Sequence, residues 1–402
     1  MNVRGPAGVR IGSVVMHHPS RVPQLRRTLR STRALAPRTV TDPDPAGPPS
    51  PLRTAKLAWA AVTPGATHHL VFQDDVTMGP ACVGALRDAV AARPTDIISL
   101  FVPWGSPNNS YAARQAAVAG SPWAPLVPGE FVPAQGLLMP TEKALDLADY
   151  LSRIPDTTRD DDALIDRFCR ERDYPVFATV PQLVEHSDDV SVAGNESHGV
   201  RRAAVPAQGW TAPPGYWTAA PVADKGGPMR ARGSSDWQHV VSFRSSSCVV
   251  RFIVPHSGEP PRHTVTGWYQ WSSLVGAPPE LVLDDMHRSL STGAGPALAA
   301  DLCQGRVPSA TAAEMWAACY LLGLDTARCA PDGLRPDPLV REGAVASWVD
   351  CGLSTRDDRT VSPSGRAALV ALGLAALAAA TRRAGQEKGL PPLGDQRKKA
   401  LS

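Results

Sequence analysis

The stretch HHLVFQDDV (68–76) is a hydrophobic run that ends in two adjacent carboxylates, Asp74 and Asp75. A short apolar run closed by polar turn residues is typical of a buried strand. In open α/β sheets, ligands bind at the carboxyl ends of the strands, which is where this prediction places Asp74 and Asp75. Two carboxylates at that edge can hold a hard divalent cation. A strand followed by an aspartate turn, whose side-chain oxygens accept from backbone amides, explains the same residues without a ligand.

Predicted strands and helices alternate on both sides of this stretch. The expected strands cover 11–16, 97–101 and 176–180, and the expected helices cover 22–35, 52–62, 82–92, 141–153 and 160–173. This alternation favours an α/β fold with a mostly parallel sheet and flanking helices. The segment 103–133 contains several Pro and Gly residues and is expected to be irregular.

Two further segments carry groups that could act together with Asp74 and Asp75. The run Asp160–Asp162 begins an amphipathic helix, where aspartate is favoured by capping and by the helix dipole. Three aspartates in succession exceed what capping requires, and a carboxylate fixed there can act as a general base. His186 lies in PQLVEHSDDVS (181–191), just after a predicted strand. A single histidine is more often structural than a ligand, but beside carboxylates it can complete a metal site.

The order of several short segments carries a family resemblance. These segments are SVVMHHPSR, TDPDP, the hydrophobic strand ending in QDDV, FVPAQGLLMP, RDDDALI and VFATVPQLVEHSD. Their order and spacing, over residues 8–200, resemble those of GT-A fold glycosyltransferases, especially small bacterial family-2-like sugar transferases. The resemblance implies a GT-A-like, Rossmann-related sheet. It also implies an enzyme that moves a sugar from a nucleotide-sugar donor to an acceptor hydroxyl.

The resemblance implies a metal site and a donor site. Asp74 and Asp75 occupy the family's DXD-like position, which binds Mn²⁺ or Mg²⁺ and the nucleotide diphosphate, with Asp75 as the first choice for direct ligation. His186 matches a histidine that completes the metal site in some members. This chain departs from the family pattern, because it has Gln-Asp-Asp where the family has Asp-x-Asp.

Nucleotide contacts are implied nearer the N-terminus. Either Asp42 or Asp44 stands where the family often contacts the nucleoside. Arg53 and Lys56 lie on a predicted helix that could face the phosphates. We therefore expect these four side chains to lie around the donor.

The resemblance also implies a base for the acceptor hydroxyl. Asp161 is the best candidate for an inverting reaction, with Asp160 and Asp162 as close alternates. A retaining reaction would not use this base, and the sequence does not separate the two outcomes. The acceptor itself, whether a glycan, a natural product or a protein, is not indicated.

Composition limits the kind of protein. The chain has 402 residues, of which 43% are hydrophobic and 20% charged, as in an ordinary globular protein. The net charge of +3 is too small to indicate a nucleic-acid partner. Charge is uneven, since residues 1–60 carry ten Arg/Lys and two Asp, whereas residues 156–196 carry eleven Asp/Glu and four Arg. A basic region can neutralise a diphosphate and an acidic one can hold a metal, although solvated surfaces give the same pattern.

Cysteine usage and hydropathy favour a soluble cytoplasmic protein. The seven cysteines are widely spaced and form no CxxC, which fits reduced thiols better than a disulfide framework. The first twenty residues lack the layout of a signal peptide. The longest apolar run, 367–380, is shorter than the ~20 residues that a transmembrane helix needs. We therefore expect no transmembrane segment.

The predicted domain organisation has four parts. They are a GT-A-like domain at 8–200, a Pro/Gly-rich linker at 201–236, a smaller α+β or mainly helical domain of unknown role at 237–385, and a flexible tail at 386–402. An alternative function is a non-catalytic binding or scaffold protein with a degenerate glycosyltransferase-like domain. The Gln-Asp-Asp motif and the unassigned second half motivate that alternative.

Overall fold

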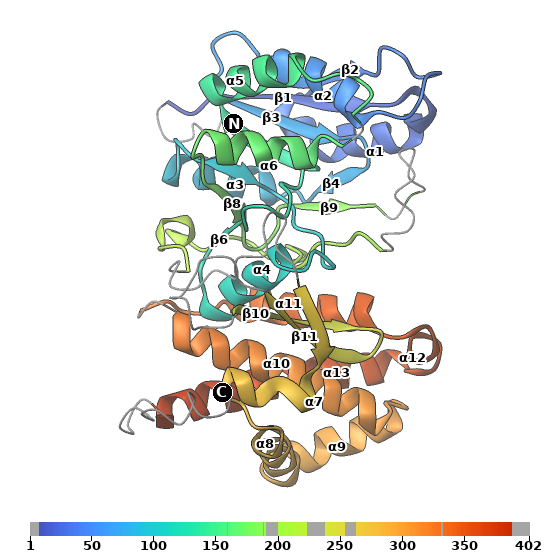
Figure 1. Cartoon of the computed structure of the whole chain (residues 1–402), viewed down its shortest axis with the longest axis vertical. Coiled ribbons are helices and arrows are strands. Elements are labelled where there is room, and N and C mark those ends of the chain that lie inside the picture. The colour runs from blue at the N-terminus through green and yellow to red at the C-terminus, as the bar shows by residue number, and fades with distance from the viewer. Residues whose placement is uncertain are drawn as a thin grey trace.

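The chain forms two packed parts, an α/β part followed by a mostly helical one (Figure 1). This computed structural model describes residues 8–158, 160–187, 189, 200–222, 238–253, 263–330 and 333–387. The first part is built on a seven-stranded sheet and the second on a three-stranded sheet covered by helices. The α/β class expected from the alternating pattern is confirmed.

The large sheet is mixed, with parallel strands predominating. Its order is β2 (Arg38–Thr41), β1 (Ile11–His17), β3 (His68–Gln73), β7 (Gly136–Pro140), β5 (Ile97–Ser99), β8 (Val176–Thr179) and β6 (Trp123–Pro125). Strands β7 and β6 run against the other five. Neither had been expected as a strand, and β7 inserts between β3 and β5, so the sheet is less parallel than predicted.

Helices flank this sheet at the places where apolar periodicity predicted most of them. They are α1 (Val22–Ser31), α2 (Pro51–Ala60), α3 (Cys82–Ala92), α4 (Asn109–Ala119), α5 (Thr141–Ser152) and α6 (Asp162–Glu171). Leu70, Val71 and Phe72 of β3 are almost completely buried beneath them. The strand expected from HHLVFQ is therefore confirmed as a central strand with both faces covered.

The connections of β1 create the place where a ligand can bind. The chain passes from β1 to β2 on one side and later to β3 on the other, and both are parallel to β1. This reversal of strand order is a topological switch point, where the carboxyl ends of the two inner strands leave a crevice. Met16 pairs with Gln73, so the residues that follow β1 and β3 meet at that crevice.

A small β-ribbon brings a distant segment to the same edge. It consists of β4 (Val76–Met78) and the antiparallel strand β9 (Val184–His186), with Val76 opposite His186. The ribbon starts directly after Asp75, and Ser187 donates its backbone N–H to the Asp75 carbonyl at 2.8 Å. The ribbon therefore holds His186 beside the aspartate pair.

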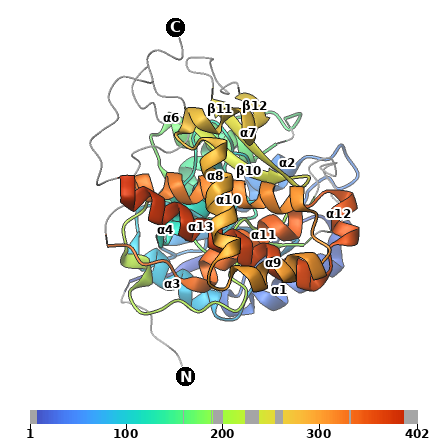
Figure 2. The same cartoon turned by 90° about the horizontal axis from the view of Figure 1, so that it is seen from below.

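The second part combines a small sheet with a helical bundle. The antiparallel strands are β10 (Gln238–Arg244), β11 (Ser247–Ile253) and β12 (His263–Gly267). The helices are α7 (Trp268–Trp271), α8 (Pro279–Ser291), α9 (Gly295–Gln304), α10 (Ser309–Cys329), α11 (Pro338–Gly352), α12 (Thr355–Thr360) and α13 (Pro363–Glu387). Figure 2 shows α10, α11 and α13 lying together in the bundle. The α+β or mainly helical character expected for this part is confirmed.

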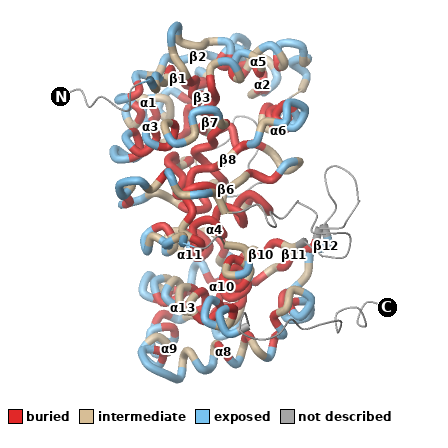
Figure 3. The backbone as a smooth tube through the Cα atoms, turned by 90° about the vertical axis from the view of Figure 1, so that its left-hand side faces the viewer, coloured by how far each residue is buried: buried red, intermediate tan, exposed pale blue. Residues whose placement is uncertain are grey.

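Helix α4 joins the two parts. Every residue of α4 is buried, because the helix packs on β6 on one side and on α10 and α11 on the other. Figure 3 shows the buried backbone continuing from the large sheet through α4 into the bundle. The segment 103–133 had been expected to be irregular, yet its centre is this helix.

The Pro/Gly-rich segment expected to be a linker is described as far as Val222. Within it, Ala203 is buried, and Ala204, Val205, Trp210 and Trp217 belong to the hydrophobic core of the first part. A composition rich in Pro and Gly therefore does not prevent this segment from packing in the core. Positions 223–236 of the expected linker and 388–402 of the expected tail lie outside the described residues.

Helix α13 is, in the described chain, the one helix long and apolar enough to cross a membrane by length and composition alone. Half of its most apolar window is buried inside the protein, where it packs against α9, α10 and α11. The core helix of a soluble protein has these same properties, so α13 is weak evidence for a membrane span.

Candidate active site

A cavity of about 690 Å³ lies at the switch point between β1 and β3. Its walls come from the loops after β1, β2 and β3, from the start of α2 and α6, and from residues close to the second part of the protein. The lining residues used below are His17, His18, Arg21, Asp42, Gln73, Asp74, Asp75, Gly105, Ser106, Gln135, Asp160, Asp161, Asp162, Arg201 and Arg244. The cavity therefore collects most of the acidic residues singled out in the sequence.

Asp74 is held by the residues that follow β1. His17 Nδ1 lies 3.1 Å from Asp74 Oδ2, and the backbone N–H of His18 donates to the same oxygen at 3.0 Å. Arg21 Nε lies 3.0 Å from Asp74 Oδ1. Burial raises the pKa of Asp74, while the Arg21 charge opposes that rise. Asp74 thus fixes the loop after β1 against the loop after β3.

Asp75 lies between a guanidinium and an imidazole. Arg21 Nη2 donates to Asp75 Oδ2 at 2.7 Å, and His186 Nε2 lies 3.1 Å from the same oxygen. Burial opposes ionisation of Asp75, but His186 and Arg21 outweigh it and lower the pKa of this carboxyl to about 2. Asp75 is therefore a carboxylate at any pH at which the protein would work.

The Asp75–His186 pair has the chemistry of an incomplete metal site. Asp75 Oδ1 and His186 Nδ1 are buried and have no hydrogen-bond partner, whereas His186 Nε2 faces Asp75 Oδ2. Buried polar atoms are rarely left unsatisfied, so each one calls for an explanation. A carboxylate oxygen and an imidazole nitrogen are both ligands for Mn²⁺, and a catalytic metal takes its remaining ligands from water and substrate phosphates. Two protein ligands fit that requirement, although His186 is not among the residues that line the cavity and the described residues contain no group of three or more His, Cys, Asp or Glu arranged for a metal.

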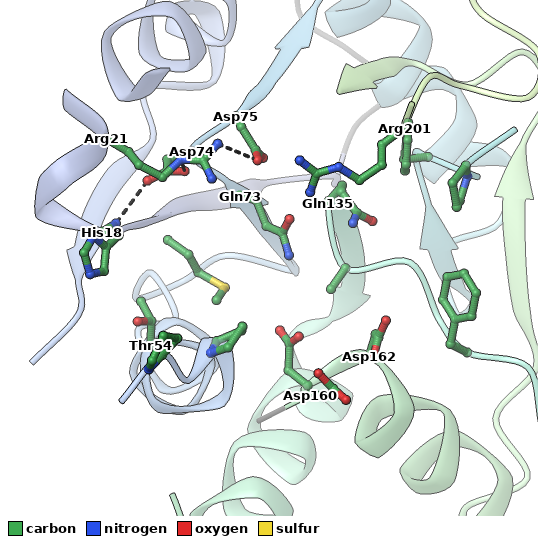
Figure 4. A pocket seen from close by; sticks show the side chains of 18 of the residues that line it. His18, Arg21, Thr54, Gln73, Asp74, Asp75, Gln135, Asp160, Asp162 and Arg201 are labelled. Atoms are coloured by element: carbon green, nitrogen blue, oxygen red, sulfur yellow. Dashed lines mark hydrogen bonds and ion pairs between the residues drawn. The ribbon is translucent and has the colours of Figure 1, made fainter. Parts of the chain in front are cut away.

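The acidic run at the start of α6 faces the cavity from the other side. Figure 4 shows Asp160 and Asp162 across the cavity from Arg21, Asp74 and Asp75. Asp160 is exposed, whereas Asp161 is buried and its Oδ2 has no hydrogen-bond partner. Burial, together with the neighbouring charges of Asp162 and Asp160, raises the pKa of Asp161 to about 7. A carboxyl group with this pKa can exchange a proton near neutral pH.

Asp42 lines the cavity as expected, but the neighbouring candidates do not. Arg53 clamps Asp42 through Nε to Oδ1 at 2.8 Å and Nη2 to Oδ2 at 2.9 Å. Burial opposes ionisation of Asp42, and the Arg53 guanidinium outweighs it and lowers the pKa of this carboxyl. Asp44 is exposed outside the cavity, and its carbonyl accepts from Arg53 at 2.6 Å. Arg53 therefore positions Asp42 and does not face a phosphate.

Lys56 likewise points away from the cavity. Its Nζ donates to Ile154 O at 2.5 Å and to Asp156 Oδ1 at 2.6 Å. Arg53 and Lys56, on the helix expected to be able to face the phosphates, are therefore not among the residues that line the cavity. Both cations lie on α2 with protein oxygens within reach, and those oxygens bind them.

Sequence reasoning missed the cations that do line the cavity. Arg21 follows β1 just as Asp74 follows β3, so the parallel pairing of these strands was the signal that could have found it. Arg201 enters from the segment beyond β9, and Figure 4 shows its side chain reaching toward Gln135. Arg244 comes from β10 in the second part. No local pattern connects either arginine with the sheet edge.

Comparison with known proteins assigns the chain to no family. No protein-family model matches the chain, and no curated protein matches its sequence.

Proposed function

We propose that the protein is a glycosyltransferase that takes a sugar from a nucleotide-sugar donor, with a GT-A-like first part. One observation carries the proposal. A cavity at a topological switch point has an arginine-held carboxylate pair on one wall and, on the facing wall, the buried carboxyl Asp161, whose raised pKa suits proton transfer. Ligand binding at this edge of an α/β sheet supports the proposal.

The wall that carries Asp75 suits the donor diphosphate. Arg21 and Arg201 both line it, and both charges act on Asp75. Guanidinium groups bind phosphate oxygens through paired hydrogen bonds. Asp75 and His186 would hold a Mn²⁺ or Mg²⁺ ion, which supplies positive charge for the leaving diphosphate.

The wall that carries Asp161 suits the acceptor. In an inverting transfer, the acceptor oxygen forms a bond to the anomeric carbon while the bond from that carbon to the diphosphate oxygen breaks. The hydroxyl proton passes to the Asp161 carboxylate, and the leaving electron pair remains on the nucleoside diphosphate. Asp160 and Asp162 raise the basicity of Asp161 through their charge.

Binding measurements test this proposal directly. Mn²⁺ titration followed by electron paramagnetic resonance, with a panel of nucleoside diphosphates, is expected to show a metal and a nucleotide bound together. Asp75→Asn and His186→Gln are each expected to weaken Mn²⁺ binding at least ~tenfold, as loss of one protein ligand would. Asp149→Asn, on the exposed face of α5, is the matched control and is expected to bind normally. Nucleotide binding that is indifferent to Mn²⁺ and to both site variants would contradict the metal assignment.

One observation favours the alternative of a non-catalytic binding or scaffold protein. Arg21 bridges Asp74 and Asp75 with contacts of 3.0 and 2.7 Å, so an internal cation already neutralises the pair. A degenerate site would bind no nucleotide in the same panel, with or without Mn²⁺. Nucleotide binding followed by slow hydrolysis of a nucleotide-sugar would favour the enzyme.

We also propose that the protein works in the cytoplasm. Cys82, Cys169 and Cys319 are buried thiols, and burial raises the pKa of each. Protonated thiols inside a core are inert, as is common in reduced compartments.

A further inference from the structure

Arg244 is a cation that the proposed donor site does not use. It ends β10 in the second part of the protein, yet it lines the cavity in the first part. Its Nη2 donates to Gly105 O at 3.1 Å, and its guanidinium lies 5.4 Å from the ring centre of Trp104. These contacts fix the guanidinium at the cavity wall, while its remaining N–H groups stay available because none of them is bonded to a described residue.

The position of Arg244 is on the acceptor side. Gly105 is followed by Ser106, whose hydroxyl donates to Glu130 at 2.5 Å. The chain then runs through Phe131 to Val132, whose N–H lies 3.4 Å from the Asp162 carbonyl. Continuous bonded contacts therefore connect the Arg244 wall with the acidic run of α6. The cations that act on Asp75 are instead Arg21 and Arg201.

Arg251 and Glu130 supply further charges near this wall. Arg251, on the neighbouring strand β11, has its pKa lowered by burial and by the Arg244 charge. The charge of Glu130 opposes that fall, and Glu130 accepts hydrogen bonds from the backbone N–H groups of Asn108 and Asn109 as well as from the Ser106 hydroxyl. No described carboxylate lies within ion-pair distance of Arg244. Arg244 is exposed at the cavity wall without an ion-pair partner among the described residues, so its guanidinium can bind an anionic group of a molecule in the cavity.

We propose that Arg244 binds an anionic group, a carboxylate or a phosphate, on the acceptor whose hydroxyl faces Asp161. This inference rests on the proposed glycosyltransferase function and adds the chemical class of the acceptor. The second part of the protein would then select the acceptor, because Arg244 is its one described residue that lines the cavity. An anion anchored there and a hydroxyl at Asp161 would give the acceptor a fixed orientation.

The test compares three sugars that differ in charge. Glucuronate, glucose 6-phosphate and glucose are titrated into the full-length protein by calorimetry, both alone and with saturating Mn²⁺ and the nucleoside diphosphate that binds best. We expect the two anionic sugars to bind at least ~tenfold more tightly than glucose, as a charge-assisted hydrogen bond allows. Arg244→Gln is expected to remove that preference without changing nucleotide affinity.

Two further variants sharpen the test. A Cβ at Gly105 would lie 2.7 Å from Arg244 Nη2, so Gly105→Ala displaces the guanidinium without removing its charge and is expected to weaken anionic sugars alone. Arg359→Gln removes an exposed arginine of α12 and is the charge control, with no expected effect.

The outcomes separate this inference from the proposed function. Equal affinity for all three sugars, or no binding of any, would overturn the role of Arg244. Competition between the anionic sugars and the nucleotide, with Arg244→Gln weakening the nucleotide, would assign Arg244 to the donor phosphates and also overturn it. Absence of nucleotide binding, with the anionic preference intact, would overturn the glycosyltransferase and leave an anion site.

Discussion

Asp161 is buried beside two other aspartates, and this environment sets its proton affinity. A carboxyl buried beside two other aspartates holds its proton up to a pH of about 7, and the base form needed for transfer then grows as the pH rises. We expect the transfer rate to increase through pH 7 and to level off above it. Asp161→Asn should lower the rate ~10²–10⁴-fold, the usual contribution of a general base, with nucleotide binding unchanged. Unchanged turnover in this variant would remove Asp161 from the reaction.

The burial of Asp161 also predicts that the stability of the folded protein depends on pH. The pKa of Asp161 is raised in the folded state, so the folded protein binds the proton more tightly than the unfolded chain does. This contribution to the free energy of unfolding is complete below pH 4 and is lost as the pH rises to about 7. The difference of roughly 3 pKa units between the folded and unfolded states corresponds to a loss on the order of 4 kcal/mol. The asparagine side chain of the Asp161→Asn variant cannot ionise. Urea unfolding should therefore find this variant more stable than the natural protein at pH 8, and nearly equal to it at pH 4.

At the scale of single elements, the local sequence pattern predicted helices and strands correctly where their own apolar residues stabilise them. The expected helix 82–92 coincides with α3, and the expected strand 11–16 lies within β1. Helix α3 buries one apolar face, and β1 is a mostly apolar strand that is buried on both faces of the sheet. Two of the elements that escaped prediction are β7 and α4. Strand β7 takes its place through pairing with β3 and β5, and α4 is buried over its whole length against β6 and against the distant helices α10 and α11.

The end of α4 gives a prediction for one element. Gly120 closes the helix with a φ of +87°, and a Cβ there would lie 2.4 Å from the Arg335 backbone. Gly65 has a φ of +75° and nothing within 4 Å. Gly65→Ala should therefore cost only the left-handed backbone, ~1 kcal/mol of unfolding free energy. Gly120→Ala should cost clearly more, because it also pushes away the segment before α11. Equal losses in chemical denaturation would mean that this segment moves freely.

At the scale of the whole molecule, the site is an assembly of segments that sequence order separates. The acidic residues could be predicted because each follows a recognisable strand or begins a helix. Arg21 could have been inferred once β1 and β3 were known to be neighbours. Arg201 and Arg244 could not, since their place depends on how residues 200–205 and β10 pack against Trp104 and Gly105. The charge of the cavity is thus a property of the tertiary structure.

Arg114 links these distant segments. It is fully buried in α4, donates to Ala344 O at 3.1 Å and to Ser347 Oγ at 2.9 Å, and lies 4.8 Å from the ring centre of Trp348. Ser347 Oγ in turn donates to Ala204 O at 2.6 Å. One chain of hydrogen bonds therefore ties α4, α11 and the segment beside the cavity rim. Burial lowers the pKa of Arg114 to about 9, so it remains charged at neutral pH and needs these acceptors.

Substitution at this link should uncouple the two parts. Arg114→Met leaves the Ala344 carbonyl without this donor and is expected to cost ~2–4 kcal/mol, whereas Arg87→Met on exposed α3 should cost under ~0.5 kcal/mol. Because Arg114 and Ser347 share one chain of hydrogen bonds, the double variant with Ser347→Ala should lose at least ~1 kcal/mol less than the sum of the single losses. Urea unfolding followed by tryptophan fluorescence and by far-ultraviolet circular dichroism checks both points. Additive losses with coincident transitions would mean that the two parts are held together elsewhere, by the apolar contacts of α4 with α10.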